Sequence, residues 1–265
     1  MKDFTVEKYK TLLKALIDKE YTFQTLEQYL RKPADRCVIL RHDIDARKGN
    51  ALVFAKIQHQ HNVCGSYYFR IVPQSWDEDI IREISGLGHE IGYHYEDLDI
   101  IRRKLGIKNH KTEWDRLSKE AWEHFKHQLA RLRSICPVET VCMHGSPLSP
   151  VNNKKLLEKY DYKSLGIIGE PYFDVDFSQI YYLTDTGRRW DGDKVSVRDK
   201  VDSSLQENFK GLVHHSTDDV IRIINEGRMP DRVMFTFHPQ RWNDAYGTWL
   251  RELVMQKAKN VVKYW

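Results

Sequence analysis

The segment CVILRHDID, residues 37–45, is the strongest indication of the fold, because a continuous apolar run leads directly into a cluster of charged side chains. Its first four residues have the pattern of a strand that is buried on both faces of a parallel sheet. Similar apolar runs recur at residues 66–72, 90–93, 140–143, 165–168, 179–183 and 232–237. We therefore expect a sheet of parallel strands built from these seven runs.

Most gaps between the runs carry apolar residues at helical spacing. The clearest helical stripe consists of Trp114, Leu117, Ala121, Phe125, Leu129 and Leu132. Strands that alternate with helices favour a parallel α/β fold, either an open doubly wound sheet or a barrel. No repeat or linker interrupts the pattern, so we expect one domain over residues 1–265, with an N-terminal helical extension over residues 1–35. Residues 185–206 lack a clear period and are expected to form an extended loop.

Composition narrows the function classes. The formal net charge is only +4, and the charged residues are interspersed, which disfavours nucleic-acid binding. A hydrophobic content of 41% is too high for a disordered chain. No segment has the length and apolarity of a membrane span or of a signal peptide. The four cysteines lack metal-binding or disulfide spacing, and we expect a cytoplasmic protein.

Polar side chains follow five of the apolar runs, in the segments 41–45, 93–97, 144–147, 184–191 and 238–242. In parallel α/β folds, the active site forms at the carboxyl ends of the strands. Asp43 and Asp45 are two residues apart, so on an extended strand both leave the same face. Two carboxylates at that separation raise each other's pKa unless a cation lies beside them. The pattern therefore indicates a divalent metal.

The histidines at neighbouring strand ends suit such a site. Imidazoles together with a carboxylate favour zinc or a similar divalent ion, with a position left open for water. A metal of this kind polarises a carbonyl and makes its bound water more acidic, as the hydrolysis of an amide or ester requires. Asp43 or Asp45 would then be left as a general base.

Three segments together resemble a known family: RHDID at residues 41–45, GHEIGYH at residues 88–94, and FH at residues 237–238. In this order they are similar to the motifs of the NodB-homology polysaccharide deacetylases, carbohydrate esterase family 4. The likeness is greatest to the branch with R-H-D-x-D and E-I-G-Y-H motifs, which is often found with surface-polysaccharide genes. It spans roughly residues 36–242.

The resemblance implies a distorted seven-stranded (β/α) barrel that removes acetyl groups from sugars with a divalent metal, zinc being expected. Asp43 matches the catalytic base and Asp45 a metal ligand. His94 matches a metal-binding histidine, and His238 matches the histidine that protonates the leaving group. The substrate is then expected to be an acetylated carbohydrate precursor.

One position departs from the family pattern. The second motif usually has the form H-x-x-x-H, which places a metal-binding histidine at Leu98, and leucine cannot bind a metal. We favour His144 as the third ligand, with Glu96 and Asp97 behind it. Alternatively, His144 replaces the arginine that orients the base in the family.

Further residues are expected to contact the substrate. The segment at residues 185–191 resembles the fourth motif of the family, in which polar and tryptophan side chains flank the sugar. The expected substrate-binding residues are Arg41, Glu96, Asp185, Arg188, Trp190 and Trp242. The two tryptophans have core packing as an equal alternative, and Arg188 has surface exposure as one.

Two other functions stay open. A relative that has lost a metal ligand at Leu98 would bind carbohydrate without hydrolysing it. A D-x-D pair also occurs in the metal site of glycosyltransferases, although no Gly-rich nucleotide loop accompanies it in this sequence. Metal-dependent deacetylation, probed by acetate release, differs from both in its product.

Overall fold

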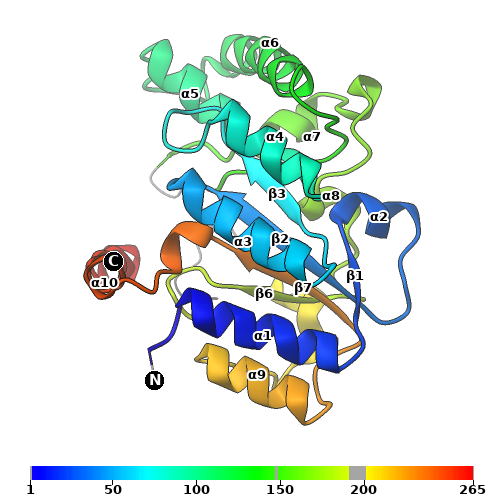
Figure 1. The fold of residues 1–265 in the computed structure, drawn as a ribbon. Coiled ribbons are helices and arrows are strands. Elements are labelled where there is room, and N and C mark those ends of the chain that lie inside the picture. Colours follow the sequence, from blue (N-terminus) through cyan, green and yellow to red (C-terminus); the bar gives the residue numbers. More distant parts are fainter. Residues whose placement is uncertain (1, 147–148, 191–200, 265) are drawn as a thin grey trace.

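A curled, all-parallel β-sheet runs through the protein, with helices packed around it (Figure 1). The computed structural model describes residues 2–146, 149–190 and 201–264. The strands are β1 (Thr22–Gln24), β2 (Cys37–Ile44), β3 (Ser66–Phe69), β4 (Glu90–Tyr95), β5 (Val141–Met143), β6 (Tyr181–Thr184) and β7 (Arg232–Phe237). Their order is β5-β4-β3-β2-β7-β6, and β1 pairs with β2 beside this path.

Ten α-helices connect and cover the strands in the described part of the chain. They are α1 (Val6–Asp18), α2 (Leu26–Arg31), α3 (Lys48–Gln60), α4 (Glu78–Gly86), α5 (Asp97–Lys104), α6 (Trp114–Arg133), α7 (Lys155–Lys159), α8 (Pro171–Asp174), α9 (Thr217–Asn225) and α10 (Tyr246–Tyr264). Short 3₁₀ helices span Lys163–Leu165, Ser203–Phe209 and Pro239–Arg241. In Figure 1, α1, α3 and α4 lie side by side over one face of the sheet.

The central strand β2 is held firmly within the sheet. All eight of its residues are buried. One edge pairs with β7 along residues 37–42, and the other pairs first with β1 and then, over residues 41–44, with β3. A strand held on both edges cannot slip in register without exposing its apolar side chains. The charged residues at its carboxyl end are therefore held in place.

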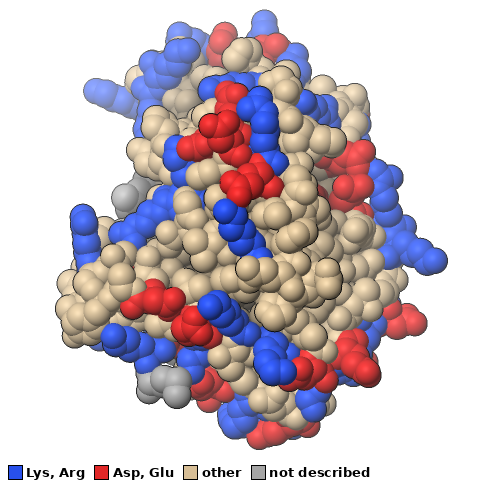
Figure 2. Space-filling view, in the orientation of Figure 1, with Lys and Arg blue, Asp and Glu red and all other residues tan. Residues whose placement is uncertain are grey.

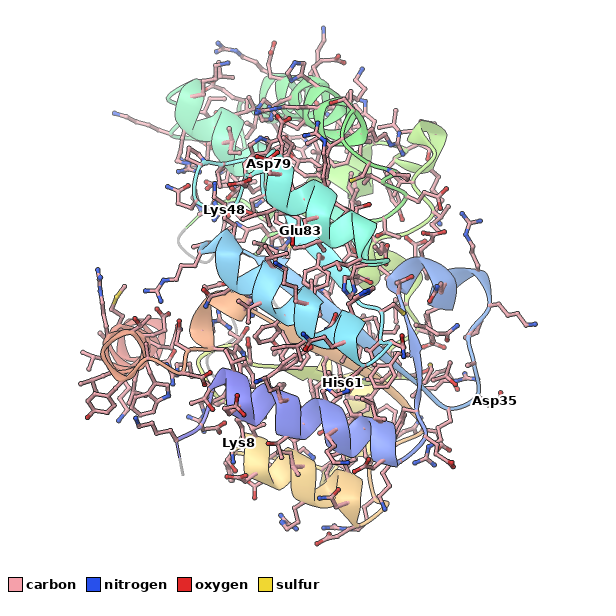
Figure 3. All side chains as sticks on the ribbon, in the orientation of Figure 1. Lys8, Asp35, Lys48, His61, Asp79 and Glu83 are labelled. Atoms are coloured by element: carbon pink, nitrogen blue, oxygen red, sulfur yellow. The ribbon has the colours of Figure 1, made fainter. Side chains whose placement is uncertain are left out.

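Charged pairs mark the seams between the helices. Lys48 at the start of α3 lies 3.1 Å from the carboxylate of Asp77, and Lys56 lies 2.8 Å from that of Glu83 on α4. Figure 3 shows Lys48, Asp79 and Glu83 along this α3–α4 seam. Such partly exposed pairs contribute at most about 1 kcal/mol each, so the apolar residues beneath them hold the helices.

The structure confirms the parallel α/β arrangement and most of the expected strands. The strand expected at residues 232–237 has those bounds, and Thr25 and Gln28 form the reciprocal capping box that their spacing indicates. The strand expected at residues 165–168 is wrong: a 3₁₀ turn ends at Leu165, Gly166 is left-handed, and a single bridge joins Gly169 to Thr140. Conversely, the sequence does not predict β1, because a three-residue strand carries no apolar run.

The expected loop at residues 185–206 is only partly within the described residues, since residues 191–200 lie outside them. Its last part enters the 3₁₀ helix Ser203–Phe209. Among the described helices, none combines the length and apolarity that crossing a membrane needs. On the face shown in Figure 2, Lys and Arg side chains are intermixed with Asp and Glu.

Gly92 on β4 is a position where only glycine fits. A Cβ there would overlap the ring carbons Cδ1 and Cε1 of Tyr68, whose hydroxyl is hydrogen-bonded to Thr140 and so cannot move aside freely. We predict that Gly92→Ala lowers the free energy of unfolding by about 1–3 kcal/mol, measured by urea titration. Gly86→Ala is the control, because a Cβ there meets no atom within 4 Å. Equal stability of the two variants would contradict the packing of Tyr68.

His89 yields a prediction about pH. Its Nδ1 accepts a hydrogen bond from the Gly65 amide and its Nε2 donates to the Ala55 carbonyl, so its role is structural. Burial lowers the pKa of His89 to about 4, although the bond to Ala55 acts in the opposite direction. The unfolded chain, with a pKa near 6.5, therefore binds the proton first, and the folded state loses stability as pH falls from about 6.5 to 4.

Glutamine can make both hydrogen bonds without titrating. We predict that His89→Gln removes up to about 3 kcal/mol of the loss of unfolding free energy between pH 7 and pH 4. The measurement is urea unfolding at several pH values in that range. His127→Gln, which removes an exposed imidazole on α6, is the control. A parallel pH dependence in wild type and His89→Gln would show that His89 does not contribute.

Candidate metal centre

Four strand ends bring acidic and imidazole side chains to one point. Asp45 follows β2, His94 lies on β4, His144 follows β5 and His238 follows β7. The Oδ1 atom of Asp45 lies 3.3 Å from Nε2 of His144 and 3.6 Å from Nε2 of His94, while its Oδ2 lies 3.9 Å from Nε2 of His238. The structure thus brings together the residues that the sequence predicts as metal ligands.

These residues fit a divalent ion. One ligand atom from each of Asp45, His94 and His144 lies within 4.8 Å of the other two. Oδ1 of Asp45 is buried and has no hydrogen-bond partner among the described residues, although such an atom is costly to leave unsatisfied. One carboxylate and two imidazoles are ligands that suit zinc, with a position left over for water.

The other ring nitrogen of each ligand histidine is already occupied. Nδ1 of His94 donates to the Cys142 carbonyl at 2.9 Å, and Nδ1 of His144 donates to Glu96 at 2.9 Å. We assign the proton to Nδ1 in both rings, which leaves both Nε2 lone pairs facing Asp45. Outer contacts of this kind fix the tautomer and orientation of metal-binding histidines.

Arg70 holds Glu96 in position through hydrogen bonds. Both Nε and Nη2 of Arg70 donate to its Oε1, at 2.8 and 2.5 Å, while its Oε2 accepts from His144. Burial acts to raise the pKa of Glu96, but His144 and Arg70 outweigh it and lower the pKa to about 2. Glu96 is therefore a carboxylate that positions His144, and this contact differs from the substrate contact expected for it.

Asp43 is fully buried and forms a two-bond ion pair with Arg41. Nε of Arg41 donates to Oδ1 at 2.8 Å and Nη2 donates to Oδ2 at 2.6 Å. Burial acts to raise the pKa of Asp43, and the charge of Arg41, assisted by His94, holds it below its usual value. The sequence predicts a substrate contact for Arg41, whereas the structure buries it completely and directs it to Asp43.

His238 is oriented by Asp185. Its Nδ1 lies 2.6 Å from Oδ1 of Asp185, which also accepts from Arg241, and its backbone amide donates to Oδ2 at 2.9 Å. Nε1 of Trp242 donates to the same Oδ2. The charges of His238 and Arg241 overcome the effect of burial and lower the pKa of Asp185. Asp185 is therefore an ionised group that fixes the orientation of His238.

Three residues expected at the substrate lie in the interior instead. Trp190 and Trp242 are 4% and 0% exposed and belong to an aromatic cluster with Phe4 and Phe237, so the packing alternative describes both. Arg188 is also buried, and it donates to the carbonyls of Asp3 and Trp249. None of the three lines the cavity at Asp45 that the structure describes.

A second group of ligand atoms competes for the same histidine. Asp43, His94 and Cys142 also lie within 4.8 Å of one another and are all buried. Arg41 donates to both oxygens of Asp43, however, and a guanidinium at that position repels a second cation. The group formed by Asp45, His94 and His144 is therefore the better metal site.

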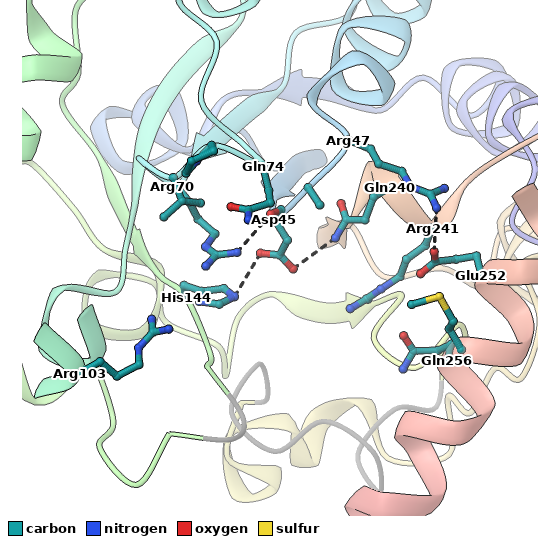
Figure 4. Close-up of a pocket in the computed structure, with 14 residues that line it drawn as sticks. Asp45, Arg47, Arg70, Gln74, Arg103, His144, Gln240, Arg241, Glu252 and Gln256 are labelled. Atoms are coloured by element: carbon teal, nitrogen blue, oxygen red, sulfur yellow. Dashed lines mark hydrogen bonds and ion pairs between the residues drawn. The ribbon is translucent and has the colours of Figure 1, made fainter. Parts of the chain in front are cut away.

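A cavity of about 620 Å³ opens at Asp45 (Figure 4). Its lining comes from the segments after β2, β3 and β7, from His144, and from α5 and α10. The lining residues are Asp45, Ala46, Arg47, Arg70, Val72, Pro73, Gln74, Arg103, His144, Gln240, Arg241, Glu252, Met255 and Gln256. This volume is in the range of small-molecule sites.

Several of these residues are not predicted by the sequence. Arg70 stands inside the apolar run at residues 66–72, and its charge is the available sign that β3 ends at Phe69. Gln240, which donates to Asp45 Oδ2 at 3.2 Å, and Arg241 belong to a polar strand-end segment, although its pattern singles out neither of them. Glu252 and Gln256 on α10 carry no signal in the sequence, since only the packing of that helix brings them to the cavity.

Comparisons with protein-family models, curated proteins and solved structures found no match to this chain.

The two ligand groups predict different effects of substitution. We predict that His144→Gln and Asp45→Asn each weaken zinc binding more than about 100-fold, because each removes a ligand, and that Glu96→Gln weakens it about 10–100-fold. Cys142→Ser should leave the affinity within a few fold. Competition with a zinc-sensitive dye measures all four. Loss of zinc in Cys142→Ser with retention in His144→Gln would place the ion in the other group.

Proposed function

We propose that this protein is a metal-dependent hydrolase that removes an acetyl group, preferably an N-acetyl group, from a sugar or a polysaccharide precursor. The observation that carries the proposal is the convergence of three imidazole Nε2 atoms on the carboxylate of Asp45, beside an ionised Asp43. The proposal includes a distorted seven-stranded (β/α) barrel of the NodB-homology type. The parallel sheet and the RHDID and GHEIGYH motifs support it.

Asp45, His94 and His144 would hold the ion, for which zinc is the preferred choice. When bound, a divalent ion polarises a carbonyl oxygen and makes water a stronger acid. Burial lowers the pKa of His94, but the carboxylates of Asp43 and Asp45 raise it overall. Metal binding at His94 therefore competes with protonation of the ring, and the affinity for zinc increases with pH.

Asp43 would serve as the general base. Each of its oxygens accepts one bond from Arg41 and keeps a further lone pair, which can take a proton from attacking water. Arg41 fixes the direction of that carboxylate, since it is bound through two parallel hydrogen bonds. The same contact makes Asp43 a weaker base, because Arg41 lowers the pKa of Asp43.

His238 would act as the general acid. Asp185 accepts a hydrogen bond from Nδ1 and so orients the ring, and Nε2 would donate a proton to the departing amine. Nε2 of His238 faces Asp45, so the proton donor is directed toward the proposed metal ligand. The base thus lies on β2, and the acid follows β7.

Carbohydrate binding without hydrolysis is the second candidate function. It is favoured by one observation: Asp43 is completely buried and does not line the described cavity. In that case the protein would bind acetylated sugars and release no acetate. The assay below therefore includes binding as well as turnover.

We predict that zinc-loaded wild type releases acetate from N-acetylated sugars and that Asp43→Asn lowers kcat about 10²–10⁴-fold, as expected for loss of a general base. Zinc content should be unchanged in Asp43→Asn and lost in Asp45→Asn. A coupled acetate assay over a panel of N- and O-acetylated sugars measures the rate, and metal analysis measures the zinc.

Asp43→Asn also leaves the buried Arg41 without a full countercharge, so unfolding by urea must show that the variant is folded. A folded, zinc-containing Asp43→Asn protein with the wild-type rate would rule out Asp43 as the base. Sugar binding by the wild type without any acetate release would establish the second candidate function.

A further inference from the structure

Arginines dominate the charged lining of the cavity at Asp45. Arg47, Arg70, Arg103 and Arg241 face two carboxylates, those of Asp45 and Glu252. In Figure 4, Arg103 approaches from the side of His144, whereas Arg47 and Arg241 lie on the side of α10. If an ion engages Asp45, Glu252 is the one carboxylate left among the lining residues to balance four guanidinium groups.

Two of the four arginines are neutralised from outside the cavity. Arg70 uses Nε and Nη2 on Glu96 and Nη1 on the Asp45 carbonyl, so all three of its nitrogens are engaged. Arg241 donates through Nη1 to Asp185. Their role is to position Glu96, Asp45 and Asp185, and they add little to recognition of a ligand.

Arg47 is different, because its guanidinium has no hydrogen bond to any described residue. Its Nη2 lies 3.6 Å from Glu252, beyond hydrogen-bond range, and its Nη1 is buried with no partner. The backbone of Arg47 is left-handed, with φ of 50° and ψ of 53°. That conformation costs about 1 kcal/mol or more for a residue with a Cβ, and it holds the side chain between β2 and α3 at the cavity.

The positive charge of Arg103 is also only partly balanced by a neighbouring carboxylate. Its partner Asp99 lies 3.2 Å from Nη2 of Arg103 and equally 3.2 Å from Nη2 of Arg102. One carboxylate therefore serves two guanidinium groups. Nη1 of Arg103 has no partner among the described residues, and the side chain is 59% exposed on the cavity rim.

We infer that this cavity binds a ligand with an anionic group, a phosphate ester or a carboxylate, through Arg47 and Arg103. Guanidinium groups recognise both anions through paired N–H donors. The proposed function then gives the substrate class: an acetylated sugar that also carries a negative charge, with its acetyl group at Asp45. Only this statement about substrate rests on the proposed hydrolysis, since anion binding is measured without turnover.

The test uses the zinc-loaded full chain and three hexoses that have no acetyl group and cannot be hydrolysed. They are glucose 1-phosphate, glucuronic acid and neutral methyl glucoside, and calorimetry gives the affinity of each. We expect at least one anionic hexose to bind about tenfold more tightly than methyl glucoside, as charge-assisted hydrogen bonds provide. Preference for glucose 1-phosphate identifies a phosphate ester, and preference for glucuronic acid identifies a carboxylate.

Substitution locates the anion. Arg47→Gln and Arg103→Gln should each reduce the preference for the anionic hexose about three- to tenfold, and added salt should reduce it in the wild type. Arg222→Gln is the matched control, because Arg222 is an exposed arginine on α9, which does not line the cavity.

Equal affinity for charged and neutral hexoses would overturn the inference. So would a preference that survives Arg47→Gln and Arg103→Gln but disappears when zinc is removed, because the anion would then bind the ion. If the preference is present and depends on both arginines while no acetylated sugar is hydrolysed, the anion site stands and the proposed hydrolysis fails. If neutral acetylated sugars are hydrolysed and no anionic preference is found, the hydrolysis stands and the anion site fails.

Discussion

The buried ion pair between Arg41 and Asp43 determines which groups can surround the carboxyl end of β2. Both side chains leave the same face of β2, and both are completely buried. Removing either partner would leave an uncompensated charge in the interior, which costs about 3–5 kcal/mol. The pair therefore keeps Asp43 ionised at the centre of the sheet, and the neighbouring strands must supply groups that are compatible with that negative charge. His94, which lies on β4 beyond β3, is one such group, with Nε2 3.8 Å from Oδ2 of Asp43.

The histidines around Asp45 share one mode of support. Each uses Nδ1 on an oxygen from outside the cluster: the Cys142 carbonyl for His94, Glu96 for His144 and Asp185 for His238. Each then presents Nε2 to Asp45 from a different strand end. Because the supporting oxygens lie on β5 or directly after β4 and β6, the position of every ring is set at the ends of the strands.

The sequence predicted the parts of the structure that depend on local pattern and missed those that depend on packing. Apolar runs located β2, β4 and β7, because strands buried in parallel sheets have this composition, and the polar residues after them became the cluster at Asp45. The same rule failed at residues 165–168, where an apolar run does not form a strand. Residue type alone could not separate a tryptophan in the core from one at a sugar site, so Trp190 and Trp242 were placed by packing with Phe4 and Phe237. For a similar reason, the sequence did not predict that α10 lines the cavity, since no motif indicates where that helix packs.

In the proposed site, His144 supplies the third metal ligand, which the side chain at position 98 does not. Leu98 is completely buried within the apolar core on α5, so its side chain is part of the packing. The sequence leaves His144 with two roles, third ligand or orienting group for the base. Arg41 already holds Asp43 through both oxygens, and His144 makes its own contacts to Glu96 and Asp45. In the proposed site, Arg41 on β2 therefore orients the base Asp43. His144 acts as the metal ligand, which Leu98 cannot do. In the proposed site, Asp45, His94 and His144 then supply three ligands, although Leu98 supplies none.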